Sequence, residues 1–165
     1  MFDEVDDLAV SRCVEQIGTE LPRDLAASGY PSDVAQRLGG EVAMLVRVFG
    51  AATGATRVSV RLDVIETDAC RRFHADYVSA RLICTLIGPG TQWLDTAAAA
   101  ALAQGEAIDR LTIRSIATGD VALFKGRLWS PEAPIVHRSP PITKTAQRRL
   151  LLVIDPAGDD APSNN

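Results

Sequence analysis

The stretch QRRLLLVID, residues 147–155, is a nearly continuous run of apolar residues that follows two arginines. Short apolar runs without polar alternation are typical of strands that are buried on both faces. We therefore expect residues 147–155 to form a central strand of a β-sheet. Successive side chains of a strand point to opposite faces, so only one of Arg148 and Arg149 can point into the interior.

Further strand signals precede this run. TRVSVRLDVIE, residues 56–66, alternates apolar and polar residues with period two, which predicts a half-buried strand. RFHADYVSARLICTLIGPG, residues 72–90, has the β-branched and aromatic content of a strand and ends at a GPG turn. We also expect strands in DRLTIRSI and VALFKGRLW, residues 109–116 and 121–129.

Helical patterns dominate the first third of the chain. Apolar residues at three- and four-residue spacing predict a helix over residues 5–18, and a proline near the start of residues 21–28 suggests a short second turn. From Ser32, a fair N-cap, the same spacing predicts one long amphipathic helix that reaches residue 50. WLDTAAAAALAQGEA, residues 93–107, is expected to be a surface helix with Asp95 as its N-cap.

This order of elements predicts the fold class. Helices followed by several short strands favour an α+β protein in which helices pack on an antiparallel sheet, sandwich or barrel. We expect one domain over residues 1–155, with a helical part at 1–55 and a β-rich core at 56–155. The remaining residues 156–165, PAGDDAPSNN, are expected to form a disordered tail.

The composition argues against several kinds of partner. The net charge is -4 and the basic residues are scattered, so we expect no binding to nucleic acid or to an anionic membrane. The chain contains no run of about 18 apolar residues, and its first residues are acidic where a secretion signal would be basic. Three widely separated cysteines suggest a reducing, cytoplasmic location. The sequence favours no oligomeric state and identifies no substrate, whether small molecule or peptide.

Three polar side chains are candidates for a metal site. His74 and Asp76 lie two residues apart in RRFHADY, so in an extended segment they point to the same face. His137, in PIVHRSPP, is the second of only two histidines. If it lies on a neighbouring strand, the three side chains form a two-histidine, one-carboxylate face with open coordination positions. Such a face is typical of Fe(II) oxygenases, and zinc can also occupy it.

Other residues leave alternatives open. Cys70 precedes His74 by four residues and could add a fourth ligand that closes the site around zinc. Ser139 could orient His137 through a hydrogen bond. Arg81 is most simply interpreted as a solvated strand arginine, but a turn at residues 78–79 would let it point inward and hold an anionic substrate.

The order of these features resembles a known superfamily. A His-x-Asp pair, a strand within GDVALF (residues 119–124), a second histidine and an arginine-led apolar strand resemble the core of Fe(II)/2-oxoglutarate-dependent oxygenases. The resemblance implies N-terminal helices packed on a double-stranded β-helix, a jelly-roll or cupin-like core. It also implies that His74, Asp76 and His137 bind Fe(II), and that an arginine pairs with the distal carboxylate of 2-oxoglutarate.

A closer resemblance is to the bacterial family known as domain of unknown function 1826. It is carried by RFHADYVSARLICTLIGPGTQWLD, VALFKGRLW, IVHRSPP and RRLLLVID, which span roughly residues 70–155. The match to RLLLVID favours Arg149 as the inward arginine, with Arg148 as the alternative. The family brings no established reaction, only a loose genomic association with zinc-homeostasis genes.

Three functions follow as hypotheses. The first is an oxygenase that uses Fe(II) and 2-oxoglutarate. The second is a cupin-like, zinc-responsive metal-binding protein without catalysis. The third is a β-sandwich interaction domain in which the two histidines never meet.

Overall fold

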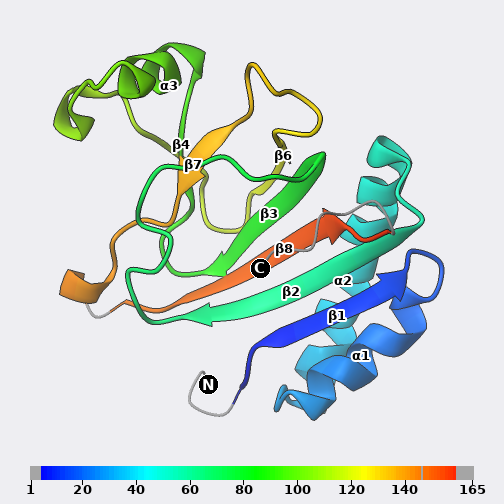
Figure 1. Ribbon diagram of the computed structural model, residues 1–165. Coiled ribbons are helices and arrows are strands. Elements are labelled where there is room, and N and C mark those ends of the chain that lie inside the picture. Colours follow the sequence, from blue (N-terminus) through cyan, green and yellow to red (C-terminus); the bar gives the residue numbers. More distant parts are fainter. Residues whose placement is uncertain (1–4, 146, 159–165) are drawn as a thin grey trace.

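A computed structural model describes residues 5–145 and 147–158, which form two antiparallel sheets (Figure 1). The larger sheet has five strands, in the spatial order β1 (Leu8–Cys13), β2 (Arg57–Ile65), β8 (Arg149–Pro156), β3 (Ala80–Ile87) and β6 (Val121–Lys125). The smaller has three, in the order β5 (Arg114–Ser115), β4 (Gln92–Leu94) and β7 (Val136–Arg138).

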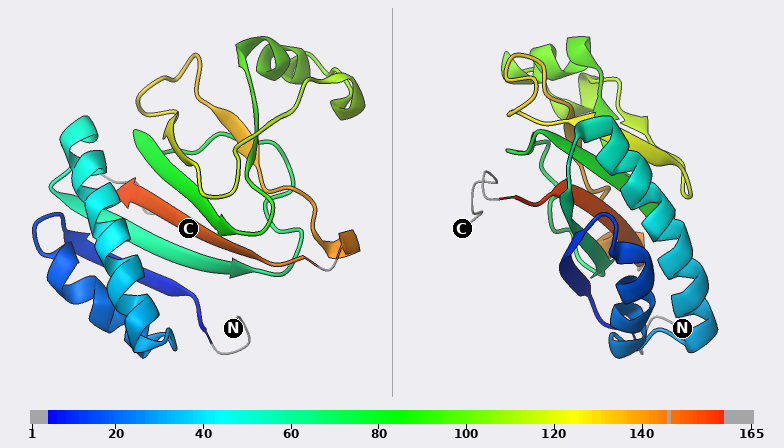
Figure 2. Two further views of the ribbon diagram at one scale, coloured as in Figure 1. Left: turned by 180° about the vertical axis from the view of Figure 1, so that it is seen from behind. Right: turned by 90° about the vertical axis from the view of Figure 1, so that its right-hand side faces the viewer.

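The helices are α1 (Ile17–Ala27), α2 (Ser32–Thr53) and α3 (Thr96–Ala103), with short 3-10 turns at Ile108–Arg110 and Thr143–Thr145. Figure 2 shows α1 and α2 together on one face of the five-stranded sheet, while α3 lies beside β4 (Figure 1). The expected combination of helices with antiparallel sheets is therefore confirmed. None of the described helices is long and apolar enough to cross a membrane.

Strand β8 is central, as its apolar run predicts. It pairs with β2 on one side and with β3 on the other, and residues 149–154 are all buried. Leu150, Leu152 and Ile154 belong to the core that includes buried residues of α1 and α2. Leu151 and Val153 belong to a second cluster, against which Trp93 and Ile135 pack on the side of the smaller sheet. A strand with apolar side chains on both faces thus separates two cores.

The prediction of a helix over residues 5–18 is wrong, because residues 8–13 form strand β1. Leu8 and Val10 lie opposite Leu62 and Val60 of β2 in antiparallel register. The same apolar residues fit period two as well as helical spacing, and the pairing satisfies the backbone groups on the outer side of β2. Long-range pairing therefore outweighs the local pattern, and the first helix begins only at Ile17.

Helix α1 also differs from the expected short turn at residues 21–28. It extends back to Ile17 and contains Pro22 inside the helix rather than in its first turn. A Cβ built on Gly39 of α2 would come within 2.8 Å of the Pro22 Cγ. Gly39 therefore permits the close approach of the two helices at the proline, which explains a glycine in the middle of α2.

The remaining predicted elements have mixed outcomes. Helix α2 is confirmed, but Pro31 rather than Ser32 occupies its N-cap. Asp95 caps α3 as expected, and its Oδ1 accepts a hydrogen bond from the Ala98 amide at 3.0 Å. Of residues 109–116, only Arg114–Ser115 form a strand.

The C-terminal tail was expected to start at residue 156. Pro156 instead ends β8, where it lies opposite Val58, and the Ala157 amide donates to the Arg57 carbonyl at 2.9 Å. The rest of the expected tail, residues 159–165, lies outside the described residues. Strand pairing with β2 thus continues further along the chain than the polar composition indicates.

Candidate metal centre

A single backbone bridge brings the two histidines together. The His74 amide donates to the His137 carbonyl at 3.0 Å, and the His137 amide donates back at 2.9 Å. The imidazole ring centroids are 4.7 Å apart. The strand expected over residues 72–79 is reduced to this one bridge. Because no longer ladder holds the segment, the chain can bend after His74 and bring Asp76 back toward the two rings.

The three predicted ligands form one compact cluster. The His137 Nε2 lies 3.3 Å from the Asp76 Oδ2, and the His74 Nε2 lies 3.8 Å from the Asp76 Oδ1. One ligand atom from each residue lies within 4.8 Å of the others. Atoms that bind one ion at about 2.1 Å lie roughly 3–4 Å apart, so a metal fits after small adjustments.

Both imidazoles are oriented for metal binding through Nε2. The Nδ1 of His74 lies 2.8 Å from the Arg72 carbonyl oxygen, and the Nδ1 of His137 lies 3.3 Å from the Ile135 carbonyl oxygen. A carbonyl oxygen only accepts, so each Nδ1 is placed to donate to it, and each ring turns its Nε2 toward Asp76, where that nitrogen can contact the carboxylate or bind a metal. Metal-binding histidines commonly have this arrangement.

Arg81 contacts the carboxylate of Asp76 and holds it in place. Its Nη1 lies 2.8 Å from the Asp76 Oδ2, while its Nε and Nη2 donate to the two oxygens of Asp155 at 2.7 and 2.8 Å. Burial alone would raise the pKa of Asp76, but the hydrogen bond from His137 and the charge of Arg81 outweigh it and lower that pKa. Asp76 is therefore an anion held in one orientation.

The expectation that Arg81 is a solvated strand arginine is wrong, because its side chain is 13% exposed. Burial alone would lower the pKa of Arg81, but the hydrogen bonds with Asp155 and Asp76 outweigh it and raise that pKa. Arg81 does point inward, yet its nitrogens already contact two carboxylates. A direct role in holding an anionic substrate stays a prediction, and the geometry fits a role in positioning Asp76.

The structure distinguishes the two arginines at the start of β8. Arg149 is fully buried and lies on the strand face shared with Leu151 and Val153. Arg148 points away and contacts Glu66 at 2.9 Å, with 41% of its side chain exposed. Strand alternation makes the two positions exclusive, so Arg149 alone can face the interior.

Arg149 donates to four uncharged oxygens. Its Nε donates to the Pro89 carbonyl at 2.7 Å and its Nη1 to the Ser139 hydroxyl at 2.8 Å. Its Nη2 donates to the hydroxyls of Thr91 at 3.0 Å and Thr85 at 3.1 Å. Burial lowers the pKa of Arg149 to about 10. Within residues 5–145 and 147–158, no carboxylate lies within ion-pair distance of this guanidinium, so the described part of the chain supplies no counter-ion to this buried cation.

A cavity of about 190 Å³ connects the two parts of the site. Its lining includes both histidines together with Thr91 and Ser139, the hydroxyl residues that contact Arg149. The expected hydrogen bond from Ser139 to His137 is not formed, because Ser139 accepts from Arg149 and the Ile135 carbonyl orients the ring instead. Ser139 therefore belongs to the arginine end of the cavity.

Cys70 does not join the cluster of ligands. It lines the cavity, but among the described residues the metal-ligand cluster contains only the two histidines and Asp76. Its backbone has a left-handed φ of 56°, and its carbonyl accepts from the Ser139 amide at 3.0 Å. The zinc site closed by Cys70 therefore has no support in this geometry.

Sequence reasoning missed Asp155, Thr85 and Thr91. A signal for Asp155 was present, because it follows Arg149, Leu151 and Val153 at two-residue steps and so shares their strand face. Nothing local marks the threonines. Thr85 comes from the neighbouring strand and Thr91 from the loop after β3, and only the assembled sheet places them beside Arg149.

Comparison with known proteins places this chain in a family. Residues 5–155 match the model of the family described as "Protein of unknown function (DUF1826)", so the chain belongs to that family and the resemblance noted in its sequence is confirmed. No curated protein sequence matches it significantly.

The chain is similar to several solved structures. The dioxygenase for auxin oxidation 1 from Arabidopsis thaliana, solved with 2-oxoglutarate, has a TM-score of 0.53 at 14% identity over 92% of this chain. A prolyl-4-hydroxylase from Pseudomonas putida has a TM-score of 0.44 at 13% identity, covering 92% of this chain and 89% of that one. This chain spans 62% of the plant dioxygenase. The likeness to the plant dioxygenase shows a shared fold.

Proposed function

We propose that this member of the DUF1826 family is an Fe(II)- and 2-oxoglutarate-dependent oxygenase, and that its two sheets are a short form of the double-stranded β-helix. One observation carries the proposal: a two-histidine, one-carboxylate cluster shares a cavity with the hydroxyl partners of a buried, uncompensated arginine.

The ligand cluster suits Fe(II). Two neutral imidazoles and one carboxylate supply three donors and leave coordination positions open for other molecules. His74 is the outermost of the three, with 39% of its side chain exposed, whereas His137 is 6% exposed. His137 and Asp76 would therefore form the buried side of the centre, and His74 the side that faces solvent and substrate.

The arginine end of the cavity suits the distal carboxylate of 2-oxoglutarate. Arg149 offers a positive charge, and the hydroxyls of Thr91 and Ser139 can turn their protons toward an anion. An anion bound there would provide a counter-ion to the buried guanidinium, which contacts no carboxylate among the described residues. A cavity of about 190 Å³ leaves room for a small dicarboxylate but not for a large cofactor.

Bound together, Fe(II) and 2-oxoglutarate supply the chemistry by which O2 oxidises a C–H bond of the substrate. The contribution of the chain itself is to place and shield these groups. Arg81 fixes the Asp76 carboxylate, and the two backbone carbonyls fix the imidazoles. The side chains of Ile83, Leu151 and Val153 form an apolar wall of the same cavity.

The test is anaerobic titration of the metal-free protein with Fe(II) and then with 2-oxoglutarate. We expect wild type to bind one Fe(II) and to develop a visible absorption band when 2-oxoglutarate chelates the metal. Arg149→Met should need at least about tenfold more 2-oxoglutarate, because the site loses its positive charge and the group that orients the Thr91 and Ser139 hydroxyls. Arg148→Met, which changes the neighbouring arginine on the other strand face, is the matched control and should behave like wild type.

The other hypotheses predict different results. A zinc-binding protein without catalysis would bind Zn²⁺ tightly, and 2-oxoglutarate would change neither its spectrum with Fe(II) nor its stability. An interaction domain would bind no metal, and His137→Ala would match wild type in every titration. Either result contradicts the oxygenase proposal.

A further inference from the structure

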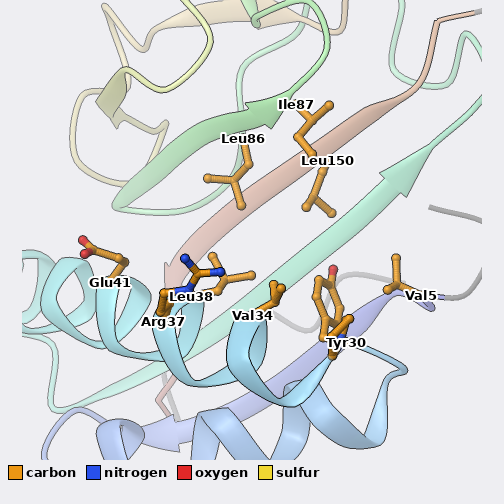
Figure 3. Close-up of a pocket in the computed structure, with 10 residues that line it drawn as sticks. Val5, Tyr30, Val34, Arg37, Leu38, Glu41, Leu86, Ile87 and Leu150 are labelled. Carbon is orange, nitrogen blue, oxygen red and sulfur yellow. The ribbon is translucent and has the colours of Figure 1, made fainter. Parts of the chain in front are cut away.

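A second cavity lies on the other face of the five-stranded sheet, between α2 and the ends of β3 and β8 (Figure 3). Its volume is about 380 Å³, within the range of small-molecule pockets. Val34 and Leu38 of α2 form one wall, and Leu86, Ile87 and Leu150 of the strands form the other. We call this cavity the helix-side cleft. Because Leu150 and Arg149 point to opposite faces of β8, the sheet separates the cleft from the metal centre.

An irregularity of the sheet shapes the strand wall of the cleft. The register between β3 and β8 shifts between Thr85 and Ile87, where a β-bulge occurs. In a regular strand Leu86 and Ile87 would point to opposite faces, but here both line the cleft. Ile87 is 40% exposed, so the cleft presents apolar surface to solvent.

Tyr30, in the loop between α1 and α2, supplies an unusual polar group. The residue is 6% exposed, and its hydroxyl is buried without a hydrogen-bond partner among the described residues. Figure 3 shows the hydroxyl pointing from the helical side of the cleft toward the strand wall that contains Leu150. Buried polar groups without partners are uncommon and destabilising, so this one requires an explanation.

The surroundings of Tyr30 define what kind of partner it needs. Burial raises the pKa of Tyr30, and the charge of Asp7 raises it further, so the phenol stays protonated and can donate a hydrogen bond. The negative charge of Asp7 disfavours a carboxylate near the hydroxyl. Arg37 and Glu41 also line the cleft, but both are exposed and Arg37 pairs with Asp33 at 3.2 Å, so neither supplies a buried charge for an ionic ligand.

We propose that the helix-side cleft binds an uncharged small molecule with an apolar body and one carbonyl or ether oxygen, and that this oxygen accepts the hydrogen bond of Tyr30. The apolar walls favour a ligand with an apolar body, and the buried Tyr30 hydroxyl, which has no partner among the described residues, favours one acceptor oxygen on that ligand. The Tyr30 hydroxyl is buried, so the side chains around it must move slightly apart before the ligand oxygen can reach it. The proposal does not depend on the oxygenase function, because the cleft lies behind the sheet.

A matched pair of probes tests the proposal on the full chain. Benzylacetone has a phenyl ring and one ketone, and isopentylbenzene is the same shape with a methyl group in place of the oxygen. We expect benzylacetone to shift the backbone NMR signals of Val34, Leu86 and Leu150. The affinity for benzylacetone relative to that for isopentylbenzene should be about 3- to 10-fold higher in wild type than in Tyr30→Phe, the effect of one net hydrogen bond.

Two variants complete the test. Tyr30→Phe removes only the hydroxyl, so it should fold, raise the Tm of the ligand-free protein and weaken benzylacetone binding about 3- to 10-fold while leaving isopentylbenzene binding unchanged. Val34→Phe should fill the cleft and prevent binding of both probes. The proposal is overturned if neither probe shifts the cleft signals, or if benzylacetone binds Tyr30→Phe as tightly as wild type.

Discussion

The two faces of strand β8 differ in what they bury. On the helical face, Leu150, Leu152 and Ile154 join a core that has 19 buried members among the described residues, all of them apolar apart from the hydroxyl of Tyr30 and the thiol of Cys84. On the opposite face the buried apolar cluster contains four residues, with Arg149 beside it. His137, Thr85, Thr91 and Ser139 are also buried there or close by.

This difference separates stability from chemistry within one strand. Apolar burial on the helical face contributes most of the hydrophobic stabilisation, roughly in proportion to the area removed from water. Burial of a charged guanidinium on the other face costs free energy, which only hydrogen bonds and a bound anion can offset. The core on the helical face of β8 therefore stabilises the fold, whereas the candidate ligand-binding residues on the opposite face do not contribute to that stability.

The largest expected effect is a loss of stability when a core residue on the helical face of β8 is truncated. Leu152→Ala should lower the free energy of unfolding by about 2–5 kcal/mol, because a fully buried leucine leaves a cavity in a large core. Urea unfolding followed by circular dichroism measures this loss. Leu151→Ala is the matched control on the other face and should destabilise the protein less. Equal losses would show that the two cores contribute alike.

The next largest effect is the loss of metal binding on the face of β8 that is opposite the helices. His137→Ala should weaken Fe(II) binding at least about 100-fold, roughly 2.7 kcal/mol, because the most buried ligand is removed. Isothermal titration under anaerobic conditions measures the affinity. Leu152→Ala, studied where it is still folded, should keep the affinity of wild type. An unchanged affinity in His137→Ala would contradict the metal centre.

A smaller loss of Fe(II) affinity is expected when Arg81, which contacts the Asp76 carboxylate, is replaced. Arg81→Gln should weaken Fe(II) binding by about 10-fold or more, because Asp76 loses the group that fixes its orientation. The same titration applies, with the exposed Arg37→Gln as the control. If Arg81→Gln binds as wild type does, the backbone alone orients Asp76 and Arg81 has only a structural role.

The smallest effect concerns Asp68, which connects the two segments that contain the histidines. Its Oδ1 accepts from the amides of Ile142 at 2.8 Å and Thr143 at 3.0 Å, and these hydrogen bonds lower the pKa of Asp68. Because the folded-state pKa lies below the ordinary value of 3.8, the contribution to stability is complete above pH 3.8 and is lost as the pH falls through the folded-state pKa.

The NMR signals of the Asp68 carboxyl group and of the Ile142 and Thr143 amides should therefore titrate together, with a midpoint below 3.8. In Asp68→Asn the two amides should show no such titration. A midpoint at or above 3.8, or amide signals that do not follow the carboxyl group, would rule out this connection.

Part of the candidate site could be predicted from sequence. The chain has only two histidines, and one of them is two residues from an aspartate, so His74, Asp76 and His137 were identifiable as ligands for one metal. That these side chains meet in space could not be predicted, because the two histidines are 63 positions apart in the chain and a single bridge joins them. The choice between Arg148 and Arg149 depended on which face of β8 turns toward the smaller sheet.

By itself, the sequence determined the elements whose residue pattern has one solution: the apolar strand β8, the alternating strand β2 and the long helix α2. The tertiary structure alone decided what depends on distant partners. It made residues 8–13 a strand because β2 offered an unpaired side, and it placed Arg81 between Asp76 and Asp155. Local periodicity reports which side chains are apolar, whereas hydrogen-bond and charge partners are set by contacts between segments far apart in the chain.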